Sequence, residues 1–261
     1  MKINVLFSNL HLDELYFTGK TCVVIDVLRA STVIVTAISN GAKEVIPVST
    51  VDFAVKVSGD AFRSQTILGG ERNTKKVEGF ALGNSPLEYT QDVIGGKSII
   101  LYTTNGSRSI VKAKFSENLF VACFNNLGAI VNHLIKLNKD VEIICAGTNG
   151  GFNLEDAVCA GNIIDRLQES KEDIELSDSS VASKLLYKNY SKNILKMLKS
   201  TDHGKLLIEN GFEDDIKECA KVDSIDVIPF FSSGVIKKLE STSNKSKKSD
   251  KNFKSVNAEE K

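Results

Sequence analysis

Short apolar runs alternate with amphipathic stretches along most of the chain. The runs are rich in Val and Ile, which is typical of buried strands, and many are followed by a cap signal and a helical pattern. Strands are predicted over residues 2–7, 21–27, 44–48, 66–68, 98–102, 119–122, 141–146 and 224–228, the last halted by Pro229. This alternation predicts an α/β fold, in layers α/β/α, around a mixed and mostly parallel sheet.

The same three residues follow two of the predicted strands, as Thr104-Asn105-Gly106 and Thr148-Asn149-Gly150. Their repetition indicates equivalent turns and is compatible with two related halves. We therefore divide the chain into an N-terminal α/β half at 1–138, which holds the glycine-rich loops, and a C-terminal α/β half at 139–240. Residues 241–261 are rich in Ser, Asn and Lys, with six lysines against three acids, and are predicted to be a disordered basic tail.

Composition narrows the class of protein. The 261 residues carry 33 basic and 33 acidic side chains, a balance that argues against a protein built around nucleic acid. The five cysteines contain no C-x-x-C pair, so neither a disulfide framework nor a structural zinc site is expected. Polar residues interrupt the N-terminus before a signal sequence can form, and no apolar run reaches membrane-span length. A cytoplasmic protein without membrane contact is expected, and a homodimer is compatible with a chain of this size.

Charged and hydroxyl side chains gather where predicted strands end. The apolar run of the strand at 21–27 stops at Asp26, and Arg29 and Ser31 follow; Thr104, Asn105 and Arg108 follow the strand at 98–102. In open α/β sheets this edge is where ligands usually bind. Taken singly, Asp26 is also compatible with a helix cap and Arg29 with a surface ion pair.

The glycine-rich stretch 68–88 adds Glu71, Arg72, Asn84 and Ser85 to the candidate residues. Ser85, Pro86 and Glu88 match a capping box that begins a helix. Exposed N–H groups, a helix N-terminus and a cation are the parts of an anion site, although an ordinary surface loop has the same composition.

Acids and arginines occur together among these candidates. Three arginines would hold a substrate with more than one anionic group, and the carboxylates among them fit a Mg²⁺ ion that bridges acid and phosphate oxygens. Further candidates lie later in the chain: Glu155, Asp156, His203, Asp214 and Asp215. Glu155 and Asp156 also suit the first turn of a helix, and His203 suits a capping or packing role.

Several common enzyme signatures are absent. The chain contains no G-x-x-x-x-G-K-[ST], no G-x-G-x-x-G after a strand and no G-x-S-x-G. Neither Cys123 nor Cys145 begins a Cys-x5-Arg loop, and Asp26 lacks the second aspartate two residues on that a haloacid-dehalogenase phosphatase would show.

Seven segments together resemble the 2-phosphosulfolactate phosphatase family, in order from about Asp26 to Pro229. They are DVLRASTVIVTAISNGAKEVIPV, LGGERNTKKVEGFALGNSPLEYT, TTNGSRS, CAGTNGGFNLEDAVCAG and the late HG, EDDI and CA segments. The sequence departs from the pattern at Asn73-Thr74, where small, glycine-like residues are expected, and at Asn149-Gly150.

The resemblance implies a Mg²⁺-dependent phosphatase that converts 2-phospho-3-sulfolactate to 3-sulfolactate and phosphate, a step of coenzyme M biosynthesis, on an unusual α/β fold. Carried over by motif position, the expected catalytic residues are Asp26, Arg29, Glu71 and Arg72. The expected substrate-binding residues are Ser31, Asn84, Ser85, Thr104, Asn105, Arg108 and His203, and the expected metal ligands are Asp26, Glu71, Glu155 and Asp156. Two other readings stay open: a phosphatase for another small phosphorylated hydroxy acid, and a protein that senses such an anion without turnover.

Overall fold

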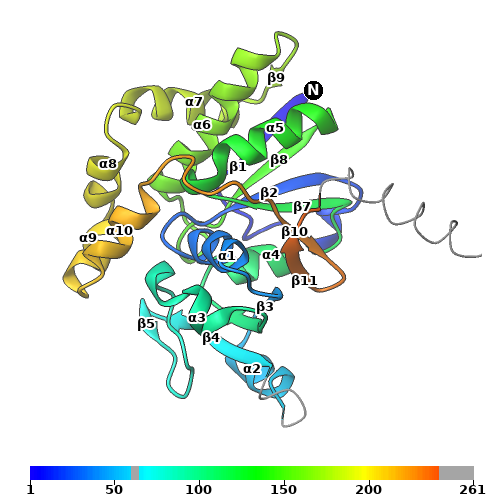
Figure 1. The fold of residues 1–261 in the computed structure, drawn as a ribbon. Helices are drawn as coiled ribbons and strands as arrows, with labels where there is room; N and C mark the ends of the chain where they lie inside the picture. Colours follow the sequence, from blue (N-terminus) through cyan, green and yellow to red (C-terminus); the bar gives the residue numbers. More distant parts are fainter. Residues whose placement is uncertain (60–64, 241–261) are drawn as a thin grey trace, which may run out of the picture.

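The structure is a computed structural model that describes residues 1–59 and 65–240, so the predicted basic tail at 241–261 lies outside the described residues. Helices cover both faces of one long sheet (Figure 1). The strands are β1 (Lys2–Leu6), β2 (Thr21–Ile25), β3 (Glu44–Val48), β4 (Thr66–Arg72), β5 (Lys75–Lys76), β6 (Ser98–Tyr102), β7 (Asn118–Ala122), β8 (Val141–Cys145), β9 (Glu175–Leu176), β10 (Pro229–Ser232) and β11 (Val235–Lys238).

The helices follow the strands in the alternation that the sequence predicts. They are α1 (Ala30–Ser39), α2 (Val51–Val57), α3 (Gln91–Ile94), α4 (Gly106–Lys112), α5 (Leu127–Leu137), α6 (Leu154–Ser170), α7 (Asp178–Tyr190), α8 (Ile194–Ser200), α9 (Asp202–Glu209) and α10 (Glu213–Cys219). Among the described residues, no helix is long and apolar enough to span a membrane.

The sheet consists of two parallel blocks joined by an antiparallel hairpin. Its strand order is β5-β4-β6-β3-β11-β10-β7-β2-β8-β1-β9. Strands β4, β6 and β3 are mutually parallel, as are β7, β2, β8, β1 and β9, whereas β10 and β11 pair antiparallel with each other and with β7 and β3. The prediction of a mixed, mostly parallel α/β sheet is confirmed.

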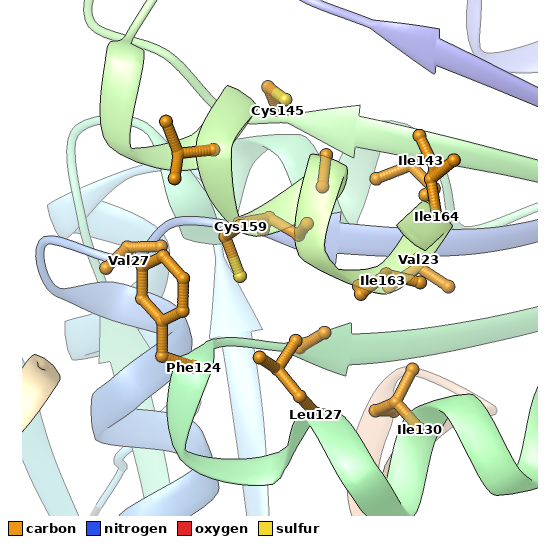
Figure 2. Close-up of a cluster of buried hydrophobic side chains, with 14 of the residues drawn as sticks. Val23, Val27, Phe124, Leu127, Ile130, Ile143, Cys145, Cys159, Ile163 and Ile164 are labelled. Carbon is orange, nitrogen blue, oxygen red and sulfur yellow. The ribbon is translucent and has the colours of Figure 1, made fainter. Parts of the chain in front are cut away.

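Strand β2 lies inside the sheet and is buried on both faces. Val23 and Ile25 point into one apolar cluster and Cys22 and Val24 into another, because successive side chains of a strand alternate between faces. The first cluster packs against α5 and α6, through side chains such as Leu127, Ile130 and Ile163 (Figure 2). The second includes residues of α1 and α4, which gives the layered α/β/α arrangement. All five cysteines are buried and unpaired, as expected of core residues.

The predicted last strand at 224–228 is wrong, because the strand begins where that prediction ends. Residues 224–228 form no strand, and β10 starts at Pro229, since proline is tolerated as the first residue of a strand although it lacks an N–H. Ser233 and Gly234 both have positive φ, 52° and 86°, which is the turn chemistry of a two-residue hairpin. This hairpin inserts between the two parallel blocks.

The predicted capping box at Ser85 is also wrong. Residues Pro86–Glu88 form a short 3₁₀ turn, and the Ser85 side chain makes no cap hydrogen bond. Instead, the Ser85 hydroxyl donates to Asp215 Oδ1 at 2.6 Å, and Glu88 accepts from the Gly83 N–H at 2.8 Å. The serine is therefore drawn toward a distant helix, away from the local backbone.

Helices α6 and α7 approach closely at Gly161, which allows a stability prediction. A Cβ atom placed there would lie 2.1 Å from the Ser183 carbonyl oxygen. We expect Gly161→Ala to lower the free energy of unfolding by about 1–3 kcal/mol, because the two backbones must separate. Urea unfolding measures the change, with Gly59→Ala as control, since its Cβ would meet its nearest neighbour at an ordinary 3.6 Å. Equal unfolding midpoints for both variants would contradict the prediction.

Candidate active site

A cavity of about 820 Å³ lies where β2, β4, β6 and β8 end. It therefore receives side chains from both parallel blocks of the sheet. Eight residues that the sequence singles out line it: Asp26, Arg29, Glu71, Arg72, Asn84, Thr104, Asn105 and His203. Residues more than 170 positions apart thus meet in one place, as expected if the strand ends form a site.

Asp26 lies at the start of the loop from β2 to α1. Its backbone N–H donates to Ser31 Oγ at 2.9 Å, and its Oδ1 accepts from the Ala30 N–H at 3.3 Å. Gly106 approaches so closely that a Cβ there would lie 2.5 Å from Asp26 Oδ2. Burial raises the pKa of Asp26 to about 7, with a further contribution from the negative charge of Glu71. Ser31 thus supports the Asp26 backbone and does not line the cavity.

Glu71 joins the loops of two neighbouring strands. Its Oε1 accepts from the Thr104 N–H at 2.7 Å, after β6, and its Oε2 accepts from the Thr74 N–H at 2.9 Å, after β4. Both oxygens are therefore engaged with backbone donors.

Asp156 joins the loops of two neighbouring strands in the other parallel block of the sheet. Its Oδ1 accepts from the Val27 N–H at 2.9 Å, after β2, and its Oδ2 accepts from the Gly147 N–H at 3.1 Å, after β8. Asp156 is 1% exposed, and burial raises the pKa of its carboxyl, together with the charges of Asp26 and Glu155. Asp156 fixes the backbone of the site and does not line the cavity.

Arg29 is held by α10 although it lies 186 residues earlier in the chain. Its Nη1 donates to Asp215 Oδ2 at 2.5 Å and its Nη2 to the Thr74 carbonyl at 2.9 Å, while the Phe212 ring centre lies 4.2 Å from the guanidinium carbon. Asp215 accepts from Ser85 through its other oxygen. Arg29 is 2% exposed, so its charge is neutralised within the protein by a buried partner.

Glu155 and His203 form a pair of unsatisfied groups beside the cavity. Glu155 Oε1 and His203 Nδ1 lie 3.9 Å apart, and neither has a hydrogen-bond partner among the described residues. Burial raises the pKa of Glu155 to about 7, with a contribution from Asp26, and lowers the pKa of His203, with a contribution from Arg29. His203 is therefore a neutral imidazole near pH 7.

Thr74, Asn84 and Thr104 add further unsatisfied atoms at the cavity. Each has a buried side-chain oxygen for which the described part of the chain supplies no partner. Buried polar atoms are normally paired, so these oxygens mark places where a ligand or water is needed.

Two charged candidates lie away from the cavity. Arg108 is exposed, and its Nε donates to the Ser49 carbonyl at 3.4 Å. Its neighbour Ser107 turns inward, where its Oγ accepts from the Thr103 N–H at 2.9 Å and its N–H donates to Thr103 Oγ1 at 2.9 Å, so the next helical position faces outward. Asp214 pairs with Lys217 at 2.7 Å on the surface of α10.

The cavity also contains residues that the sequence reasoning did not single out as site residues, including Lys75, Asn153, Phe152 and Leu206. Lys75 belongs to the hairpin of β4 and β5, in which the strand register places Lys75 opposite Arg72. The turn residues Asn73 and Thr74 have φ of 53° and 67°. Glycine-like residues are expected at these two positions, and the backbone adopts the left-handed conformation that glycine favours.

A single Mg²⁺ fits the acids that remain. Within the described ranges no cluster of three or more His, Cys, Asp or Glu side chains could hold a metal by itself. Both oxygens of Glu71 and of Asp156 accept backbone hydrogen bonds of 2.7–3.1 Å, whereas Asp26 Oδ1 accepts a longer one of 3.3 Å and Glu155 Oε1 has no partner among the described residues. Mg²⁺ is usually bound by one or two carboxylates, with waters and substrate phosphate oxygens as its other ligands.

Comparison with known proteins gives the family. The family model for 2-phosphosulpholactate phosphatase matches residues 9–234. A probable 2-phosphosulfolactate phosphatase of Caldanaerobacter subterraneus subsp. tengcongensis is 45% identical over 218 residues, 84% of this chain and 90% of the relative. A second, of Clostridium novyi, is 42% identical over 231 residues, 88% of this chain and 97% of the relative. The chain therefore belongs to the 2-phosphosulfolactate phosphatase family and is a phosphoric monoester hydrolase.

Proposed function

We propose that this enzyme uses Mg²⁺ to hydrolyse 2-phospho-3-sulfolactate to 3-sulfolactate and phosphate, the reaction of coenzyme M biosynthesis. The observation that carries the proposal is a cavity lined by Asp26 and by cations suited to a multiply charged anion, with Glu155 Oε1 3.9 Å from the lining residue His203. The proposed substrate, 2-phospho-3-sulfolactate, bears phosphate, carboxylate and sulfonate groups. The names of the two relatives state the same substrate.

Asp26 and Glu155 would hold the metal. Their raised pKa values, about 7 in each case, reflect carboxylates crowded in a buried site, and a bound cation would offset that cost. A Mg²⁺ ion held there would neutralise phosphate charge and would lower the pKa of water bound to it.

The remaining residues position the substrate. Arg29 would contact an anionic group while Asp215 and Phe212 keep its guanidinium fixed. The hydroxyls of Thr74 and Thr104 are donors without partners in the described structure and suit phosphate oxygens. Such fixed donors accelerate phosphoryl transfer by holding the reacting group in line and by stabilising its charge.

Phosphate release from 2-phosphosulfolactate tests the proposal, with 2-phospholactate and an aryl phosphate measured beside it, each with Mg²⁺ or with excess EDTA. We expect fast release from the sulfonated substrate that stops in EDTA and returns with Mg²⁺. Preference for phospholactate would assign the enzyme to another phosphorylated hydroxy acid. Binding without release from any ester would indicate an anion sensor and refute the proposal.

A further inference from the structure

The charges that line the cavity divide into compensated and uncompensated groups. Arg29 is paired with Asp215 at 2.5 Å. Arg72 and Lys75 both line the cavity, and neither makes an ion pair with any described residue. These two side chains therefore carry the positive charge that remains available to a ligand.

The hairpin that bears Arg72 and Lys75 is held in a fixed conformation. The two cations occupy opposite positions across the turn, in the register Arg72 to Lys75. Thr74 has φ of 67°, which is unfavourable for a β-branched residue, and it persists because both of its backbone groups are bound. Its N–H donates to Glu71 at 2.9 Å and its carbonyl accepts from Arg29 at 2.9 Å.

The substrate's own chemistry says which group these cations would meet. In 2-phospho-3-sulfolactate the carboxylate and the phosphate ester share one carbon, whereas the sulfonate lies on the next carbon. The sulfonate can therefore reach cations apart from the metal and Asp26. It stays fully ionised at neutral pH, so it requires cationic partners when it leaves water.

We propose that Lys75, together with Arg72, forms the subsite that binds the sulfonate and so selects the sulfonated substrate. This inference rests on the proposed function and adds a specificity-determining residue to it. Lys76, the next residue along β5, is exposed and does not line the cavity, which makes it a matched control.

The test compares Lys75→Met and Lys76→Met on 2-phosphosulfolactate and 2-phospholactate. Removing a charged hydrogen bond should lower kcat/KM for the sulfonated substrate about 10- to 100-fold, mainly through KM. Hydrolysis of phospholactate, which lacks the sulfonate, should stay within about twofold, as should both reactions of Lys76→Met. Equal losses on both substrates, or no loss on either, would overturn the proposal.

Calorimetric binding of 3-sulfolactate separates this inference from the proposed function. Weaker binding by Lys75→Met than by Lys76→Met would support the subsite even if the wild-type enzyme released no phosphate from either ester. In that case the reaction assignment fails while the subsite stands. Equal affinities of the two variants for 3-sulfolactate would refute the subsite.

Discussion

Asp26→Asn should make the metal-free protein more stable at neutral pH while removing its phosphatase activity. In the folded state the pKa of Asp26 is raised from 3.8 to about 7, so folding opposes its ionisation. Three pKa units correspond to up to about 4 kcal/mol, and asparagine removes that penalty because it carries no charge. Turnover should fall by about 100-fold or more, since a proposed metal ligand is lost.

The sign of the pH dependence makes this prediction specific. Below about pH 4 the Asp26 carboxyl is protonated in both the folded and the unfolded state, so it does not lower the free energy of unfolding. Between pH 4 and 7 the unfolded chain releases the proton first, so wild-type stability falls as pH rises, and the full cost applies above pH 7. Urea unfolding in EDTA at pH 4, 6 and 8 should show a difference between variant and wild type that grows with pH. A variant that is less stable than wild type at pH 8 would contradict the account of Asp26.

Asp215→Asn should have the opposite effect on stability, although it removes a buried carboxylate from the same region. Asp215 neutralises Arg29, and both side chains are almost fully buried, with side-chain exposures of 4% and 1%. Loss of the partner leaves a buried guanidinium charge uncompensated, which should cost about 3–5 kcal/mol in the free energy of unfolding. Turnover should fall about 100-fold as well, because Arg29 and the Ser85 loop lose their common anchor.

Asp214→Asn is the matched control for Asp215, since its carboxylate pairs with Lys217 on the surface. Its stability and turnover should match those of the wild type. Rescue by added guanidinium separates a positioning role of Asp215 from a general loss of structure. Guanidinium should restore part of the activity of Arg29→Gly. It should restore none in the double variant that also carries Asp215→Asn. Equal rescue in both would show that Asp215 does not position the cation.

Much of the fold can be predicted from local patterns in the sequence. Strands such as Glu44–Val48 and Ser98–Tyr102 are short, β-branched and bounded by turn residues, and both occur where the sequence predicts them. The gathering of Asp26, Glu71 and Thr104 at one edge also follows, because parallel strands deliver their carboxyl ends to the same side.

What the sequence could not show depends on contacts between distant segments. The residues around Ser85 predict a helix cap, but the Ser85 hydroxyl donates to Asp215 instead. Arg29 and Arg108 look equivalent after two strands, yet one is buried against α10 and the other faces outward from α4. Lys75 carries no local signal, since only the hairpin places it at the cavity while its neighbour Lys76 stays outside. The catalytic and metal-binding roles of individual residues stay predictions.

A crystal structure of Asp26→Asn with intact 2-phosphosulfolactate would test most directly that this cavity is where the phosphate ester is hydrolysed. We predict the phosphate beside residue 26 and Glu155, with the sulfonate against Arg72 and Lys75. A substrate bound with its phosphate outside this cavity would contradict this prediction.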